Sequence, residues 1–199
     1  MTPTASHELT TVERDTLVAL ARAAIADRLH GDGALDRALR ETELTPALKT
    51  PRGAFVTLRT RVADGTSGKG PLRGCIGTMT ANDPLYRAVI RSAQSSAFED
   101  PRFPPVTESQ VGGITIEISA LTPPVAVDGP EAVVVGRDGV QLEKDGHRAV
   151  FLPQVATEQG WDTTTLLENL YVKAGLPRNA WKGATLEVFE AEVFGEAGN

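Results

Sequence analysis

The apolar residues of the N-terminal segment recur every three or four positions, which is the spacing of one face of a helix. This repeat runs from Thr10 to about His30. Thr10 and Glu13 match a capping box and Gly31 matches a helix stop, so the pattern predicts one long helix. The segment that follows, as far as Pro51, contains glycines and prolines with little periodicity. We expect mostly loop there.

The pattern then changes to a period of two, which is typical of strands. Residues 53–60 alternate and are rich in β-branched and aromatic types, and residues 71–79 resume an extended pattern after the flexible turn at 64–70. These features predict a β-hairpin. Residues 113–121 place three isoleucines on one side of a half-buried strand. The other side carries Thr115, Glu117 and Ser119.

Two further helices have clear start and stop signals. Asp83 and Pro84 begin a helix that we expect to end near Phe98, where a proline-rich loop opens. Asp162 is a predicted N-cap, and Gly175 is the expected residue after the C-terminus of that helix.

The remaining signals predict a second hairpin and a terminal strand. Residues 139–144 and 147–152 alternate on either side of Asp145-Gly146, a dipeptide favoured in two-residue hairpin turns. Residues 184–194 read as a strand. Hairpins and a few helices without regular βαβ alternation predict an α+β fold with a mixed or antiparallel sheet.

Composition narrows the function classes. The 199 residues carry a net charge of −6, and their pI near 5.1 argues against nucleic-acid binding. One cysteine and three histidines form neither an internal disulfide nor a structural zinc site. No secretion signal and no apolar run of about 18 residues is present, so we expect a cytoplasmic protein without a membrane span. Nucleotide and zinc-protease motifs are absent, and we predict neither cofactor nor metal.

Cys75 is the principal candidate for chemistry. It stands between Gly74 and Gly77 and two residues after Arg73. Glycines on a strand permit close approach of a ligand or of another backbone. Alternate strand residues share a face, so Arg73 and Cys75 are expected to face the same space, where a guanidinium favours thiolate. The competing interpretation is that Cys75 packs as a small hydrophobe.

Charge and loop stiffness supply further candidates. The segment 52–91 holds seven Lys and Arg against two Asp, and this excess of positive charge favours a small anion or an acidic peptide as partner. The alternative is that these are solvated faces. The loop at 100–105 has three prolines, which suits the holding of polar groups in place. We therefore add further candidate residues: Asp100, Arg102, Phe103, Gln154 and Glu158.

The order of several short motifs resembles one known family. GAFVTLR, LRGCIG, DPRFPPV, IEISAL, GRDGV, FLPQV and YVKAGLP stand in the order of AMMECR-type domains, the protein A component of the AmmeMemoRadiSam system. The resemblance covers nearly the whole chain. It implies one domain over residues 10–195, with flexible tails at 1–9 and 196–199. Within it, a larger and a smaller subdomain would enclose a cleft lined by the LRGCIG strand.

The resemblance also implies association with a radical SAM enzyme and with a Memo-like protein related to class III extradiol dioxygenases. Relatives often carry a second cysteine before KAGL, in a pattern like LCxKAGL, where this chain has Leu170-Tyr171-Val172-Lys173. A two-cysteine redox or metal mechanism is therefore not expected to be general here.

Two hypotheses for function follow. In the first, Cys75 is the thiolate of an enzyme or covalent carrier, Arg73 activates it and holds an anionic group, and Asp100 or Glu158 transfers protons. In the second, the same cleft is a binding or scaffold module for a peptide, a small anionic metabolite or a partner protein.

Overall fold

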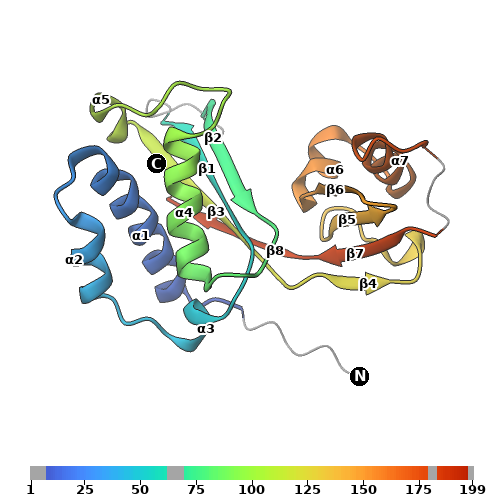
Figure 1. Ribbon diagram of the computed structural model, residues 1–199, viewed down its shortest axis with the longest axis horizontal. Coiled ribbons are helices and arrows are strands. Elements are labelled where there is room, and N and C mark those ends of the chain that lie inside the picture. The colour runs from blue at the N-terminus through green and yellow to red at the C-terminus, as the bar shows by residue number, and fades with distance from the viewer. Residues whose placement is uncertain (1–7, 62–69, 179–182, 197–199) are drawn as a thin grey trace. The chain divides into compact units, whose positions relative to one another are not determined.

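The computed structural model describes residues 8–61, 70–178 and 183–196. The chain forms two compact units. The first unit comprises Met1–Ala120 and Glu192–Asn199, and the second unit comprises Leu121–Ala191. Each unit contains one four-stranded sheet with helices (Figure 1). The described strand pairs are antiparallel, which confirms the α+β class. No helix in these ranges is both long and apolar enough to cross a membrane.

The first unit begins with the predicted helix, confirmed with its capping box at Thr10 and its left-handed Gly31. The expectation of mostly loop after it was wrong, because two short helices lie there. The helix over Ala34–Glu41 packs against the long N-terminal helix, which is a tertiary contact. The helix over Pro46–Lys49 is capped by Thr45, whose side chain accepts a hydrogen bond from the Leu48 N–H. The elements of this unit are α1 (Thr11–His30), α2 (Ala34–Glu41), α3 (Pro46–Lys49), β1 (Ala54–Thr60), β2 (Leu72–Thr78), α4 (Leu85–Phe98), α5 (Glu108–Val111), β3 (Ile114–Leu121) and β8 (Ala191–Gly195).

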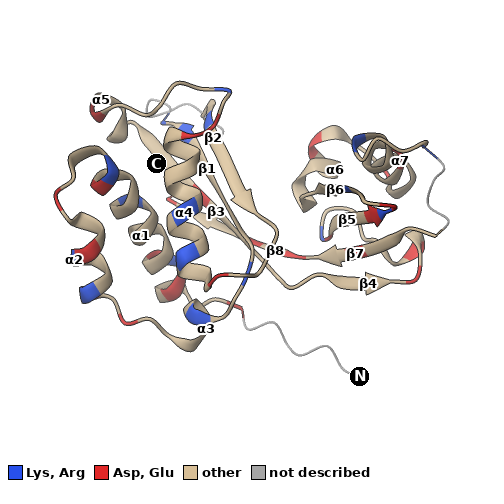
Figure 2. Ribbon diagram, in the orientation of Figure 1, with Lys and Arg blue, Asp and Glu red and all other residues tan. Residues whose placement is uncertain are grey.

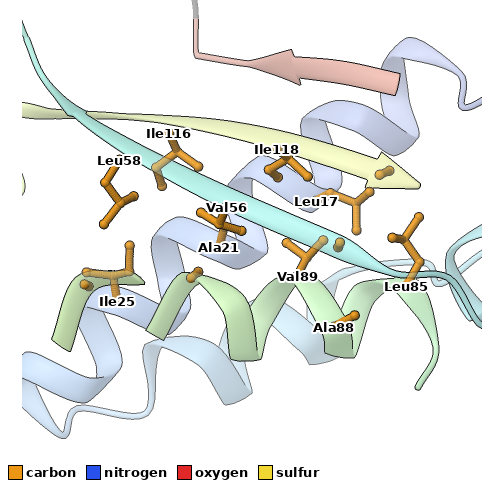
Figure 3. Close-up of a cluster of buried hydrophobic side chains, with 14 of the residues drawn as sticks. Leu17, Ala21, Ile25, Val56, Leu58, Leu85, Ala88, Val89, Ile116 and Ile118 are labelled. Atoms are coloured by element: carbon orange, nitrogen blue, oxygen red, sulfur yellow. The ribbon is translucent and has the colours of Figure 1, made fainter. Parts of the chain in front are cut away.

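The strand β1 organises the first sheet, whose order is β2-β1-β3-β8. It pairs antiparallel with β2, confirming the first hairpin, and antiparallel with β3. The helices α1 and α4 lie side by side against this sheet (Figure 1). Figure 3 shows the core between strands and helices, where Val56 and Leu58 of β1 meet Ile116 and Ile118 of β3. All four side chains are buried, as the period-two pattern predicted.

The helix α4 approaches β2 very closely, and glycine makes this possible. A Cβ placed on Gly74 would stand 2.1 Å from the backbone oxygen of Ser96. The Ser96 hydroxyl enters the ladder between the strands, where its Oγ accepts the Ile76 N–H at 2.7 Å and donates to the Val56 carbonyl at 2.7 Å. A helix side chain therefore replaces part of the β1–β2 hydrogen bonding.

The second unit contains the predicted second hairpin, whose turn residues Asp145 and Gly146 both have positive φ. The Asp162-capped helix is also confirmed. The expected terminal strand is divided at Glu190 into two strands, one in each sheet. The elements of this unit are β4 (Val125–Val127), η1 (Pro130–Ala132), β5 (Gly139–Lys144), β6 (His147–Phe151), α6 (Pro153–Gln159), α7 (Thr163–Lys173) and β7 (Thr185–Phe189).

Two residues assigned to the tails are part of the first unit. Leu9 is buried, and its backbone N–H donates to Glu192. Glu196 forms an ion pair with Arg22, and its backbone N–H donates to the Ile116 carbonyl. Both contacts come from chain segments distant in sequence, and the domain bounds at 10 and 195 stay a prediction. The other predicted tail positions, apart from Glu8, lie outside the described residues.

Replacing Gly74 with Ala is expected to destabilise the protein by about 1–3 kcal/mol, because the new methyl group overlaps the backbone of α4 rather than a movable side chain. Urea unfolding followed by circular dichroism measures the change. Gly112→Ala is the matched control, since its Cβ meets nothing within 4 Å. Equal free energies of unfolding for the two variants would contradict this account of the helix–strand contact.

Candidate functional site

Cys75 lies on the face of the first sheet that is opposite the helix-packed core. Its register partner on β1 is Thr57, and the register partner of Thr57 on β3 is Glu117. Directly opposed residues share a face, so these three residues form one row across three strands, called here the Cys75 row. All three side chains are half-buried. The Thr57 hydroxyl donates a hydrogen bond to the Cys75 Sγ over 3.3 Å.

The backbone of Cys75 is held on its outer side by two charged side chains. β2 is an edge strand, so alternate residues direct their N–H and C=O away from β1. The Cys75 N–H donates to Asp100 Oδ2 at 2.8 Å, and the Cys75 carbonyl accepts from Arg102 Nη2 at 3.3 Å. The Asp100–Arg102 pair thus takes the place that a neighbouring strand would occupy.

Asp100 and Arg102 bind each other in a two-pronged ion pair. Arg102 Nε donates to Oδ1 at 2.9 Å and Nη2 to Oδ2 at 2.7 Å, while the Asp100 side chain is only 2% exposed. The hydrogen bond from Arg102 is the main reason that the pKa of Asp100 lies far below its usual range. Such a carboxylate stays ionised at neutral pH. The geometry therefore favours a structural role for Asp100 over the proton transfer expected from sequence.

The expectation that Arg73 shares the face of Cys75 depended on regular alternation along β2. The register shifts beside Arg73, with Gly74 opposite Leu58 and Leu72 opposite Arg59, so Arg73 is the extra residue of a bulge. The bulge interrupts the alternation on which the prediction depended. The Arg73 side chain is buried and donates to the carbonyl of Pro104.

The Arg73 guanidinium also contacts two side chains, those of Gln110 and Phe103. It donates to the Gln110 oxygen at 3.1 Å and stands 6.0 Å from the centre of the Phe103 ring. Arg102 stands 5.5 Å from the same ring. Both guanidinium groups therefore lie near the Phe103 ring, and the one that reaches the Cys75 backbone belongs to Arg102.

The two glycines that flank Cys75 accommodate neighbouring backbone. Gly74 faces the Ser96 carbonyl, and a Cβ on Gly77 would stand 2.3 Å from the Ala54 oxygen and 2.5 Å from the ring of Phe55. Of the two explanations for these glycines, approach of another backbone accounts for both. Ligand binding by Gly74 or Gly77 stays a prediction.

Gln154 and Glu158 belong to the second unit, where both lie on α6. Gln154 is half-buried and Glu158 is exposed. Their participation in a site with Cys75, and the cleft that the resemblance implies, stay predictions.

The basic segment is spread over several environments. Figure 2 shows Lys and Arg on α4 together with acidic and basic residues on α1 and α2. Arg52 is buried and pairs with Glu192, and Arg91 pairs with Asp83. These ion pairs weaken the argument for one concentrated anion-attracting patch. Across the described ranges, no three His, Cys, Asp or Glu side chains lie close enough to hold a metal ion.

Sequence reasoning did not single out Thr57, Glu117 or Ser96 as parts of the site. The face of the strand or helix on which each residue lies could be predicted from the sequence. Thr57 and Glu117 alternate with core residues, and Ser96 lies on the buried side of α4. The missing information was the pairing of β1 with β3, which aligns residues 60 positions apart.

The comparisons with known proteins agree with this architecture. The AMMECR1 family model matches residues 18–194. The chain belongs to the AMMECR1 family. A relative from Methanothermobacter thermautotrophicus is 40% identical over 194 residues, covering 94% of this chain and 95% of its own. Protein PF1979 of Pyrococcus furiosus is 40% identical over 191 residues, covering 90% of this chain and 86% of its own.

A solved structure shares the fold of this AMMECR1 family member. The crystal structure of uncharacterised protein PH0010 from Pyrococcus horikoshii is similar with a TM-score of 0.74 and 37% identity. The similarity covers 92% of this chain and 91% of that one. The family and the fold are therefore shown.

Asp100 is expected to make stability depend on pH. Its pKa is lowered in the folded protein, so its contribution is complete above the unfolded carboxyl pKa near 4 and is lost as pH falls below that value. Urea unfolding of the wild type and Asp100→Asn at pH 7 and pH 3 measures this. The stability gap between the two proteins should shrink at pH 3, whereas Glu108→Gln, at an exposed acid, should show no such gap. A gap independent of pH would contradict the ionised role.

Proposed function

We propose that this AMMECR1 family protein is a cysteine-dependent enzyme or covalent carrier whose reacting atom is the Cys75 sulfur. One observation carries the proposal: the thiol is half-buried on the face opposite the core, rather than packed among the buried aliphatic residues of β1 and β3. A cysteine that served only as a small hydrophobe would favour the core face. The clamped backbone of Cys75 gives its sulfur a fixed position.

The chemical step that suits this arrangement is nucleophilic displacement. The Cys75 sulfur forms a bond to an electrophilic carbon, the leaving group departs with the bonding electron pair, and the thiol proton passes to solvent. The Thr57 hydroxyl, which donates to Sγ, stabilises the negative charge that develops on sulfur before the bond forms. Substrates of this proposal are small molecules or modified peptides.

The partners of the proposed activity are a radical SAM enzyme and a Memo-like protein, with the substrate passing between them. The support is the family membership together with the motif order described above. Isothermal titration of this chain with each purified partner tests the proposal. Absence of binding to both, with and without a Cys75 adduct, would contradict it. A cytoplasmic location remains part of the same proposal.

A binding or scaffold module is the second candidate function, and the Asp100 ion pair favours it. The carboxylate expected to move protons is instead engaged with Arg102 and the Cys75 backbone. In this case Cys75→Ser leaves ligand or partner binding unchanged, while Arg73→Ala weakens it. The order of these two effects separates the two functions.

The thiol of the folded protein is expected to react with iodoacetamide at pH 7 faster than the thiol of the urea-unfolded chain, because Thr57 stabilises developing negative charge. Intact mass spectrometry over time gives both rate constants. Cys75→Ser is the blank, since the chain has one cysteine. Protection in the folded state with reaction only after unfolding would identify a packed thiol and favour the binding module.

Thr57→Val is expected to slow this alkylation by about three- to tenfold at pH 7, because valine keeps the shape of threonine but removes the donor to sulfur. Thr57→Ser should restore most of the rate. Thr115→Val is the matched control, because Thr115 lies on the same face and is opposite Arg59 rather than Thr57. Equal rates for Thr57→Val and Thr115→Val would show that the hydrogen bond does not assist the thiol.

A further inference from the structure

The position of Arg102 specifies the chemical class of molecule that reaches Cys75. We infer that Arg102 binds the negatively charged group of the reacting molecule, an inference that rests on the proposed function. The substrates are then small electrophiles that carry a carboxylate or a similar anion. Sequence reasoning gave this role to Arg73. The structure buries the Arg73 guanidinium against Pro104 and Gln110 instead.

Arg102 has the exposure that an anion-binding group requires. Its Nε and Nη2 are engaged by Asp100, and Nη2 also contacts the Cys75 carbonyl. Within the described residues no hydrogen bond is recorded for Nη1, and the side chain is 54% exposed. The outer part of the guanidinium therefore offers N–H donors to solvent beside the residue whose sulfur reacts.

The carboxylate of Asp100 does not cancel this attraction, because it lies on the inner side of the pair. Its two oxygens accept the Cys75 N–H, the Arg102 N–H and both Arg102 side-chain donors. With its side chain 2% exposed, it is shielded from an approaching ligand. An arriving anion thus meets the guanidinium first, and Asp100 fixes the orientation of that guanidinium.

The remaining contacts of Arg102 keep it rigid and charged. The Phe103 ring lies 5.5 Å from the guanidinium carbon. The pKa of Arg102 is raised, chiefly by the hydrogen bond to Asp100, with a smaller electrostatic contribution from the Cys75 side chain. The 3.3 Å contact between Arg102 Nη2 and the Cys75 carbonyl places the guanidinium beside Cys75. A fixed cation beside a nucleophile favours anionic electrophiles over neutral ones.

Two alkylating reagents test the inference without knowledge of the natural substrate. Iodoacetate and iodoacetamide react at the same kind of carbon and both release iodide as sulfur forms its bond, but only iodoacetate is an anion. The quantity measured is the ratio of their rate constants, iodoacetate over iodoacetamide, by intact mass at pH 7. This ratio should be about fivefold higher for the folded wild type than for the urea-unfolded chain. The excess should decrease with added salt.

Arg102→Gln should return the ratio to that of the unfolded chain. Arg28→Gln is the matched control, because Arg28 is also half-exposed, pairs with a carboxylate of Glu99 at 2.7 Å and lies 5.0 Å from the centre of the Phe98 ring. It differs from Arg102 in having no recorded contact with Cys75. Arg28→Gln should keep the wild-type ratio, and an equal loss in both variants would overturn the inference.

Folding of the variants is checked by circular dichroism and urea unfolding. If Arg102→Gln does not fold, the double variant Asp100→Asn, Arg102→Gln removes both charges together, and Arg102→Lys keeps the cation without the two-pronged geometry. The ratio should fall in the double variant and lie between the two extremes in Arg102→Lys.

The outcomes separate this inference from the function on which it rests. If folded Cys75 reacts with neither reagent, the proposed function fails and the inference fails with it. If folded Cys75 reacts readily with both reagents in the ratio of the unfolded chain, the cysteine function stands and the anionic substrate class is wrong. A ratio that rises only in the wild type and in Arg28→Gln supports both.

Discussion

The two-residue repeat of β1 is the constraint on which the rest of the first unit depends. Val56 and Leu58 turn toward α1 and α4 and are fully buried, so the intervening residue Thr57 has to face the other way. Antiparallel pairing on both sides of β1 then transfers this division to β2 and β3. Cys75 and Glu117 occupy the outer face because the hydrophobic core occupies the inner one.

The edge position of β2 creates a second requirement, which polar side chains satisfy. An edge strand leaves backbone donors and acceptors without a strand partner. At Cys75, Asp100 and Arg102 satisfy them, and on the inner side the Ser96 hydroxyl bridges β1 and β2. The same contacts that close the sheet edge also fix the cysteine and orient the guanidinium of Arg102. Stability and the proposed chemistry therefore rest on one set of hydrogen bonds.

Much of the fold could be predicted from the sequence because the caps and turns that define its elements are local signals. The capping box at Thr10, the Asp145-Gly146 turn and the Asp162 cap each predicted an element that the structure contains. The prediction of a loop before Pro51 was wrong because α2 packs against α1. No local signal in the sequence reveals that contact. The prediction of one terminal strand was wrong at Glu190. The alternation of apolar and polar residues continues through the position where the chain leaves one sheet and enters the other.

The sequence by itself determined the family and the α+β class, since motifs and periodicity are properties of neighbouring residues. Tertiary structure decided which guanidinium contacts the Cys75 backbone. At Arg73 a bulge interrupts the alternation and the side chain binds the Pro104 carbonyl, whereas Arg102, paired with Asp100, reaches the Cys75 backbone. Tertiary structure also aligned Thr57 with both Cys75 and Glu117. Register and bulges arise from packing between distant segments, so no local pattern encodes them.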